Sequence, residues 1–334
     1  MTEPAVQQSP SALPPVFVCN YWFSAFAEHV NHNKYNFSLP LTAHAGLAFF
    51  SSTPGQPDNI LDSMTNYYSP IYGIAEQPIA TLPCAATLQH HASIFSAYDY
   101  INILPLYNNQ AQAWCQSFAT LGFKGFIYQH SVNWYEPNIT SLAQYWQRRP
   151  SQLKNTLKRK QELMNKDGNF TVKVYSEGSA EVLMQALIDY HQVYYHSWKR
   201  SEPTPAFIDC ICQHNWQINA LRIGVIYYNN EPIAAQIWFV YDKTAAIFKL
   251  AYNKDFTRFS PGTVLTAALL EHVICRDNVN TVDFLTGNDD YKKDWMSAKQ
   301  PLYGIQLCNK RTWRGKLKAL TNAIANFKHK PAPK

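Results

Sequence analysis

The order of strand and helix patterns between residues 170 and 308 limits the fold of this chain more than any other feature. The order is strand, two helices, three strands, helix, strand, helix and strand, and few folds share it. A strand, a crossover helix and a second strand normally form a parallel pair. We therefore expect the strands at 245–252 and 281–285 to lie side by side, with the intervening helix packed over both.

Alternating apolar residues, apolar stripes at helical spacing and short polar turns define these elements. Asn229-Asn230 and Asp242-Lys243 suit two tight turns, so the three central strands should form an antiparallel meander. The expected elements are a strand at 170–176, a helix with the stripe Leu183, Leu187, Tyr190, Tyr194 and Trp198, a helix at 205–220, strands beginning at 221, 232 and 245, a helix from 261, a strand at 281–285, a helix at 291–296 and a strand at 303–308.

The length of 334 residues exceeds the roughly 250 to 300 at which single cores stop growing, so two domains are expected. The first half faintly repeats the later order, with a strand at 100–107, a helix and another strand. The predicted class is α+β, an α/β sandwich of two tandem domains with mixed sheets and helices on both faces. The expected parts are a flexible leader at 1–15, domains at 16–165 and 166–328, and a tail at 329–334.

The stretch FSPGTVLTAALL, residues 259–270, predicts a helix with an unusual first turn. Ser260 suits the N-cap and Pro261 the first helical position, yet Gly262 costs roughly 1 kcal/mol relative to alanine. No acidic side chain is present before Glu271 to balance the positive helix end. Such a start can seat a phosphate on its unpaired N–H groups. It can equally be an ordinary capped helix with a closely packed glycine.

Three polar residues interrupt otherwise apolar strands: Gln236, Lys249 and Asp283. Burying a charge is costly unless it is paired or has a function. If the strands of Lys249 and Asp283 are neighbours, the two side chains could form an ion pair beside the helix start. The pair would be either architectural or part of a reaction cleft, where perturbed charged groups gather.

The segment GNDDYKKDW, residues 287–295, follows the strand end where ligands bind in sheets of this kind. Tyr291 and Lys292 are candidate proton donors or carboxylate anchors, and Asp289 or Asp290 is a candidate base. Polar residues are also common in loops without such a function, so none of these signals is decisive alone.

Charge and cysteine content restrict the partners. The net charge is +6, and much of the positive charge lies in 148–160 and 310–334, which suits anionic partners but also fits two solvated helix faces.

The seven cysteines form no CxxC pair and have no histidine cluster near them, so we expect reduced thiols and no metal. No apolar run approaches the roughly 18 residues of a membrane span, and 1–15 does not resemble a signal peptide. A cytoplasmic location is expected.

The C-terminal segment has an amphipathic pattern. Trp313, Leu317, Leu320 and Ile324 recur near helical spacing among basic residues. Such a helix could contact a membrane surface. The interpretation favoured by the sequence is an ordinary docked terminal helix.

Several long stretches, together with the order of elements, resemble the GNAT superfamily of acyl-CoA N-acyltransferases. They are most similar to the cellulose-biosynthesis-type acetyltransferase family, which is related to the Fem-type peptidyltransferases with two such domains in tandem. The N-terminal domain would then be a degenerate GNAT-like copy. The stretches are NYYSPIYG at 66–73, NWYEP, YWQRRPSQLKNTLKRK, SWKRSEPTPAFI, PIAAQIW, FKLAYNKDFTRFSPGTVLT and DFLTGNDDYKKDWM.

The resemblance implies transfer of an acyl group, usually acetyl from acetyl-CoA, to an amine of a small molecule or glycan, in polysaccharide or cell-envelope synthesis. The cofactor would lie between the two parallel strands. The sequence FTRFSPGT departs from the usual Arg/Gln-x-x-Gly-x-Gly/Ala loop of the superfamily. An acyl carrier protein or an aminoacyl-tRNA is therefore a second candidate donor, and the basic segment 148–160 would suit either. The implied cofactor contacts are Ser260, Gly262, Thr263, Val264 and Tyr252.

Such a transfer needs a base for the amine proton, donors for the oxyanion and an acid for the departing thiolate. On this resemblance, Asp283 is the base and Tyr291 the acid, while Lys292 and Lys249 position an acidic acceptor or balance Asp283. No cysteine need be catalytic. The rival interpretation is a non-catalytic scaffold of the same fold.

Overall fold

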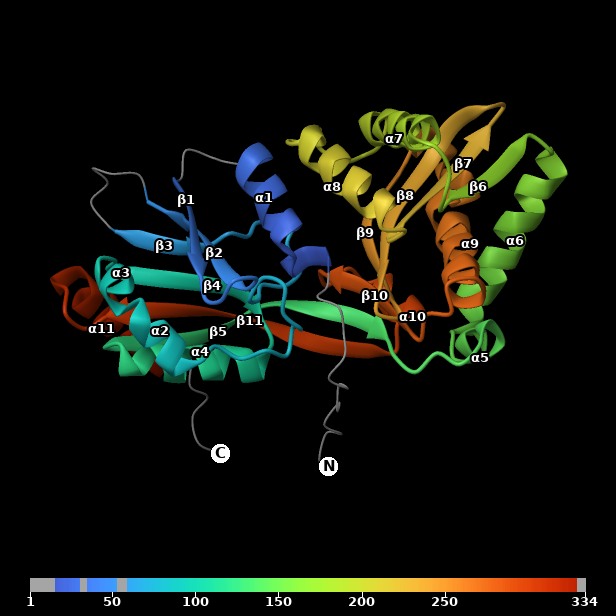
Figure 1. Cartoon of the computed structure of the whole chain (residues 1–334). Helices are drawn as coiled ribbons and strands as arrows, with labels where there is room; N and C mark the ends of the chain where they lie inside the picture. The colour runs from blue at the N-terminus through green and yellow to red at the C-terminus, as the bar shows by residue number, and fades with distance from the viewer. Residues whose placement is uncertain (1–15, 31–34, 53–58, 329–334) are drawn as a thin grey trace, which may run out of the picture. The chain divides into compact units, whose positions relative to one another are not determined.

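The computed structural model describes residues 16–30, 35–52 and 59–328 (Figure 1). The leader expected at 1–15 and the tail expected at 329–334 lie outside these described residues. The chain divides into two compact units. Unit 1 runs to Ser131 and resumes at Pro301, and unit 2 comprises Val132–Gln300.

The helices and strands have the following bounds. Up to the first unit boundary they are η1 (Val16–Val18), α1 (Asn20–His29), β1 (Tyr35–Pro40), β2 (Gly46–Ser51), β3 (Ile60–Ser63), α2 (Ala85–His90), α3 (Ala92–Ser96), β4 (Tyr100–Leu106), α4 (Asn108–Thr120) and β5 (Phe123–Glu136), which continues into unit 2. The others are α5 (Leu142–Gln147), α6 (Ser151–Asp167), β6 (Phe170–Tyr175), α7 (Ala180–Tyr195), α8 (Pro205–Gln217), β7 (Leu221–Tyr228), β8 (Glu231–Tyr241), β9 (Thr244–Tyr252), η2 (Lys254–Phe259), α9 (Pro261–Cys275), β10 (Thr281–Thr286), α10 (Lys292–Trp295), β11 (Ala298–Asn309) and α11 (Trp313–Lys328).

Unit 2 contains a mixed sheet in the order β6-β7-β8-β9-β10, followed by the end of β5. β6 to β9 pair antiparallel. Both two-residue turns have positive φ throughout, 49° and 67° at Asn229-Asn230 and 40° and 57° at Asp242-Lys243. Asn and Asp tolerate this left-handed backbone, which matches the twist of a hairpin. The meander predicted from the sequence is therefore confirmed.

Helices cover both faces of the unit 2 sheet, with α7 and α8 on one face and α9 with α6 on the other (Figure 1). α9 lies so close to β7 that a Cβ on Gly224 would come within 2.7 Å of Cδ1 of Leu269. Glycine at this point of the strand lets the helix approach. Leu265, Leu269 and Val273 on α9 are fully buried.

β9 and β10 form the parallel pair that the crossover through α9 predicts, but the pairing is short. Thr244–Ala246 face Thr281–Asp283, and the pairing ends there. Beyond this point β9 stays paired with β8 as far as Tyr252, while β10 stays paired with β5. The carboxyl halves of the two parallel strands have therefore parted from one another.

The strands of unit 1 follow the order β1-β2-β3-β4-β11-β5, in which β3 and β4 are parallel. Successive residues of β2 point to opposite faces. Phe50 meets Phe26 of α1 at 5.7 Å between ring centroids, and Phe49 meets Phe95 of α3 at 6.4 Å. The predicted class is confirmed: the chain is mixed α+β, with mixed sheets and helices on both faces.

The unit boundary differs from the domain boundary expected after residue 165. Residues 132–165 belong to unit 2, because Asn133–Glu136 of β5 pairs with β10 and because α6 packs on α9. Most of β11 belongs to unit 1, where Tyr303–Cys308 pairs with β4. Local sequence cannot assign a strand to a sheet when its partner lies far along the chain.

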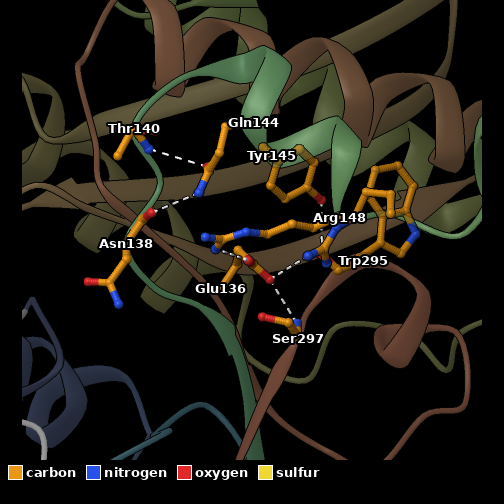
Figure 2. Close-up of polar contacts among 9 residues, drawn as sticks. Glu136, Asn138, Thr140, Gln144, Tyr145, Arg148, Trp295 and Ser297 are labelled. Carbon is orange, nitrogen blue, oxygen red and sulfur yellow. Dashed lines mark hydrogen bonds and ion pairs between the residues drawn. The ribbon is translucent and has the colours of Figure 1, made fainter.

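A buried ion-pair cluster connects the end of β5 with the segments that follow it (Figure 2). The Glu136 carboxylate is 0% exposed and accepts hydrogen bonds from Arg148 at 3.2 Å, from Arg149 at 2.7 Å and from the Ser297 amide at 2.8 Å. Arg149 also donates to the Trp295 carbonyl. Two basic residues of the segment expected to face anionic partners thus pair with Glu136, and one of them, Arg149, is buried.

We predict that Glu136→Gln lowers the free energy of unfolding by about 3 to 5 kcal/mol, because it leaves the buried Arg149 guanidinium without a counter-charge. Arg148→Gln is the matched control. The Arg148 side chain is 45% exposed, so its loss should cost at most about 1 kcal/mol. Urea unfolding followed by circular dichroism measures both values. Equal losses in the two variants would contradict this account of the cluster.

Candidate functional site

Each of the two parting strands contains a β-bulge near the point of separation. In β9 the extra residue is Phe248, since Ile247 and Lys249 face successive residues of β8. In β10 the register shifts between Asp283 and Thr286. A bulge bends its strand and redirects side chains, and bulges are frequent beside active sites. The strands part at their carboxyl ends, which is where ligands bind in open sheets of this kind.

The start of α9 keeps one free backbone donor. Ser260 is the N-cap residue, as expected, but it lies in the left-handed region, with φ 49° and ψ 52°, and its side chain makes no cap hydrogen bond. The Ser260 carbonyl accepts from the Thr263 amide at 3.0 Å and from the Val264 amide at 3.2 Å. Pro261 has no N–H. Among the described residues, the Gly262 amide is therefore the donor of this turn that has no acceptor.

The first turn of α9 is not completely buried by the rest of the protein. Gly262 and Thr263 are partly exposed, whereas Val264 is buried. Of the backbone N–H groups of Gly262, Thr263 and Val264, only that of Gly262 remains free at the positive end of the helix macrodipole. That combination still favours an anionic group.

The ring of Tyr252 lies against the first turn of α9, and a second aromatic ring packs on Tyr252. A Cβ on Gly262 would come within 3.3 Å of Cδ1 of Tyr252, so glycine allows this close approach. The Tyr252 ring contacts Trp198 at 4.4 Å between centroids. Trp198 was expected inside the helix that is α7, but the helix ends before it and Ser197 forms a β-bridge with Asn253. Trp198 is 50% exposed, so the pair offers a stacking surface beside the helix start.

Gln236, the polar residue of the middle strand, supports this turn from inside. Its amide nitrogen donates to the Gly262 carbonyl at 3.1 Å and to the Thr266 hydroxyl at 2.8 Å. Its oxygen accepts from the Trp238 indole at 2.9 Å. The residue is 1% exposed, so Gln236 holds α9 on β8 and does not face a ligand.

Asp283 lies at the last residue of the parallel pairing. Both carboxylate oxygens accept from the Asn133 amide, at 2.9 and 3.1 Å, and one of them accepts from the Leu285 amide at 2.7 Å. Burial raises the pKa of Asp283 to about 6, although these hydrogen bonds and the charge of Lys292 lower it in part. A carboxyl with such a pKa is ionised at neutral pH and still accepts a proton readily, as a general base must.

The ion pair considered between Lys249 and Asp283 does not form. The register places Asp283 opposite Ala246, and the strands have parted before Lys249 is reached. Lys249 instead pairs with Glu202 at 2.8 Å, with side chains only 10% and 4% exposed. Burial lowers the pKa of Lys249, and the neighbouring carboxylate of Glu202 raises it in part.

Lys199 adds a second cation to this cluster. Its ammonium lies 5.7 Å from the ring centroids of both Tyr194 and Trp198, and no carboxylate of the described residues lies within ion-pair distance of it. Burial and the nearby charge of Lys249 lower the pKa of Lys199 to about 8. Glu202 forms its ion pair with Lys249, while the charges of Glu202 and Asp289 act on Lys199 from beyond ion-pair distance. Lys199 instead lies beside two aromatic rings.

Lys292 holds the end of β10. Its ammonium donates to the carbonyls of Phe284 at 2.9 Å, Leu285 at 3.4 Å and Thr286 at 2.7 Å, and the residue is 4% exposed. Burial lowers the pKa of Lys292, while the nearby carboxylates raise it in part. Three consecutive carbonyls at the end of the parted strand are satisfied in this way. The structure therefore directs Lys292 toward the backbone and gives it a positioning role.

Tyr291 and the two acidic candidates lie after β10. Tyr291 is 43% exposed, and its ring centroid is 6.3 Å from that of Phe284. Burial and the charge of Asp289 raise the pKa of Tyr291 to about 12, so the phenol keeps its proton at neutral pH. The side chains of Asp289 and Asp290 are 64% and 98% exposed. Asp283, which is shielded and held by hydrogen bonds, is the better-placed base.

Other features of unit 2 lie apart from this cluster. An apolar hollow of about 510 Å³ between α7 and α8 is lined by residues such as Leu183, Met184, Ile188 and Trp216, and none of the predicted site residues lines it. Over the described ranges, no group of three or more His, Cys, Asp or Glu side chains is placed to hold a metal ion. None of the helices described has the length and apolar character needed to cross a membrane.

The structure brings to these strands several residues that the sequence alone does not predict there. One comes from β5, and the others lie in the segment after α7, which a β-bridge from Ser197 to Asn253 brings beside the end of β9. The segment SWKRSEP was noted for its resemblance, but no local pattern in it predicts contact with β9. The missed residues are Asn133, Trp198, Lys199 and Glu202.

Comparison with known proteins finds a match to a family model over part of unit 2 and similarities in fold over most of the chain. Residues 151–293 match a family model described as acetyltransferase (GNAT) domain. The chain is similar in structure to FemX, with a TM-score of 0.55 and 10% identity over 90% of this chain and 97% of that one. It is also similar to L-PGS from Bacillus licheniformis, with a TM-score of 0.53 and 10% identity over 95% and 98% of the two chains.

A conserved protein of unknown function from Bacteroides thetaiotaomicron VPI-5482 has a TM-score of 0.57 and 10% identity, over 88% of this chain and 92% of that one. No curated protein matches the chain. Identities this low show the fold alone. The fold is GNAT-like and mixed α+β, and the matched residues include β9, α9 and most of the surrounding sheet. Such a fold supports acyl transfer as the class of reaction.

Proposed function

We propose that the chain is an N-acyltransferase that moves an acyl group, acetyl in the simplest case, from an acyl-CoA to an amine. The observation that carries this proposal is the parting of β9 and β10 beside the free Gly262 amide at the start of α9. The helix end attracts a pyrophosphate. A strand edge without a partner can pair with the amides of an extended arm. A thioester donor such as acetyl-CoA contains both groups.

In this proposal the pyrophosphate lies at the first turn of α9, from Ser260 to Val264, where the Gly262 amide donates to it. Thr263 is partly exposed on the same turn. Tyr252 and Trp198 flank the turn and offer their rings to the donor. The resemblance to cellulose-biosynthesis-type acetyltransferases supports a place in polysaccharide or cell-envelope synthesis.

Thr263→Asp should weaken acetyl-CoA binding by at least about tenfold, because a carboxylate on this turn repels the pyrophosphate. The same carboxylate favours the helix macrodipole, so the free energy of unfolding should not fall. Thr263→Asn, which has the same shape without the charge, is the matched control. Isothermal titration calorimetry with acetyl-CoA and with longer acyl-CoAs measures the binding.

Two other results, one from this titration and one from a tRNA-binding assay, would contradict an acyl-CoA donor. If the unaltered protein gives no saturable heat with any acyl-CoA, the donor assignment is wrong and the scaffold interpretation gains. Retention of tRNA that weakens steeply with salt would instead favour an aminoacyl-tRNA donor.

Asp283 is the general base of the proposed reaction, directly or through a water molecule. It takes a proton from the acceptor nitrogen as that nitrogen attacks the thioester carbonyl carbon. The new C–N bond forms, the C–S bond breaks, and the thiolate receives a proton from Tyr291. Asn133 holds both oxygens of Asp283 and so positions the base.

Asp283→Asn should lower kcat by about two to four orders of magnitude, the usual contribution of a general base. In the unaltered enzyme kcat/KM should fall as the pH drops below about 6, because Asp283 then becomes protonated, and the variant should lack this acidic limb. Asp290→Asn, whose side chain is 98% exposed, is the control and should keep its rate. Near-normal turnover in both Asp283→Asn and Tyr291→Phe would remove these two roles.

The acceptor amine carries an acidic group in this proposal. Lys249 has its ion pair with Glu202, whereas Lys199 has no ion-pair partner among the described residues and feels Glu202 and Asp289 only from a greater distance. A carboxylate or phosphate on the acceptor would supply the missing negative charge, because a shielded cation gains more from a partner than an exposed one.

Mass spectrometry of small molecules that co-purify with the protein tests this assignment. Amines that carry a carboxylate or phosphate should be retained by the unaltered protein and lost from Lys199→Met. Lys293→Met, whose side chain is 60% exposed, should retain them. Retention of only neutral or cationic amines would contradict an acidic acceptor.

A further inference from the structure

The terminal helix α11 of unit 1 docks on the protein in an unusual orientation. Its contact face is made of small or polar residues. A Cβ on Gly315 would come within 2.1 Å of the Asn309 carbonyl oxygen, so the helix backbone lies directly on the end of β11. Further along the helix, Asn322 donates to the side-chain oxygen of Gln306 at 2.7 Å. These contacts fix which side of the helix faces the protein.

The large apolar residues of α11 lie on the opposite face. Trp313 is 66% exposed, Leu317 55%, Leu320 58% and Ile324 50%. Their spacing of four, three and four residues places them in one stripe, about half a turn around the helix from Gly315. The helix therefore docks, as expected, but through the face opposite this stripe. The stripe faces outward because the contact between Gly315 and Asn309 fixes the opposite face of the helix on the protein.

The charges around this stripe have one sign. Lys310, Arg311 and Lys316 are exposed, and Arg314 and Lys318 are partly exposed. The sequence contains no Asp or Glu from Lys310 to its end at Lys334. Helical geometry places Arg314 on one side of the stripe and Lys316 on the other. An exposed stripe of large apolar residues flanked by cations is the pattern of helices that lie in the surface of an anionic membrane.

We propose that α11 binds the protein to an anionic lipid surface, with Trp313, Leu317, Leu320 and Ile324 inserted among the lipids and the flanking cations on the headgroups. A second copy of this chain is a poorer occupant. In a symmetric dimer the same patch meets itself, so two sets of cations with no acidic partner would face one another. This inference does not depend on the acyltransferase proposal, because α11 belongs to unit 1 and contains none of the proposed catalytic residues.

Flotation of the full chain with lipid vesicles tests the proposal. The protein should float with vesicles of phosphatidylcholine and phosphatidylglycerol, much less with pure phosphatidylcholine, and less again as salt is raised. Leu317→Gln with Leu320→Gln should lower binding by at least about tenfold, because two inserted side chains are lost. Lys316→Gln should lower it about fivefold on the anionic vesicles alone.

Met184→Gln with Ile188→Gln is the matched control, since these α7 side chains are 61% and 51% exposed and also stand four residues apart. This control should bind vesicles normally. All variants change exposed side chains, so their thermal unfolding should match that of the unaltered protein. The proposal is overturned if the unaltered protein ignores anionic vesicles or if the leucine variant floats equally well. It is also overturned if sedimentation velocity shows a dimer that the leucine changes dissociate while vesicles are not bound.

Discussion

The loss of pairing between β9 and β10 after Ala246 and Asp283 is the constraint on which the rest of unit 2 depends. Strands that part must satisfy their backbone groups in some other way. The buried ammonium of Lys292 does this for three carbonyls at the end of β10. On β9, the residues after Ala246 keep β8 as the strand partner of one edge, and the edge that faced β10 has no strand partner among the described residues. The two strand ends are thus held apart by the fold itself, before any ligand arrives.

The polar residues around the parted strand ends are of two kinds. Some are buried and hydrogen-bond only to the protein, and others keep a group that is available to a ligand. Gln236 and Lys292 are buried, and their hydrogen bonds go to the protein. Asp283 has its orientation fixed by Asn133 but retains a pKa near neutrality. Lys199 has no carboxylate partner among the described residues. Asp283 and Lys199 are therefore the groups that can act on a substrate.

Local patterns in the sequence were sufficient for much of unit 2. Turn residues such as Asn229-Asn230 and the spacing of apolar residues predict the meander and α9, because these signals depend on neighbours in the chain. Register and long-range contacts are not local. For that reason the sequence failed to predict the pairing of Lys249 with Glu202, the assignment of β11 to unit 1, and the outward stripe of α11. The left-handed backbone of Ser260 likewise follows from η2 before it and not from serine itself.

Amide hydrogen exchange with acetyl-CoA present and absent tests the central claim most directly. If the donor lies between the parted strands with its pyrophosphate at the start of α9, peptides covering Tyr252 to Val264 and the end of β10 should exchange more slowly when acetyl-CoA is added. The helix α11 should be unchanged and serves as the internal reference. Unaltered exchange at Gly262 and its neighbours, with saturating donor and protection appearing elsewhere, would contradict the account.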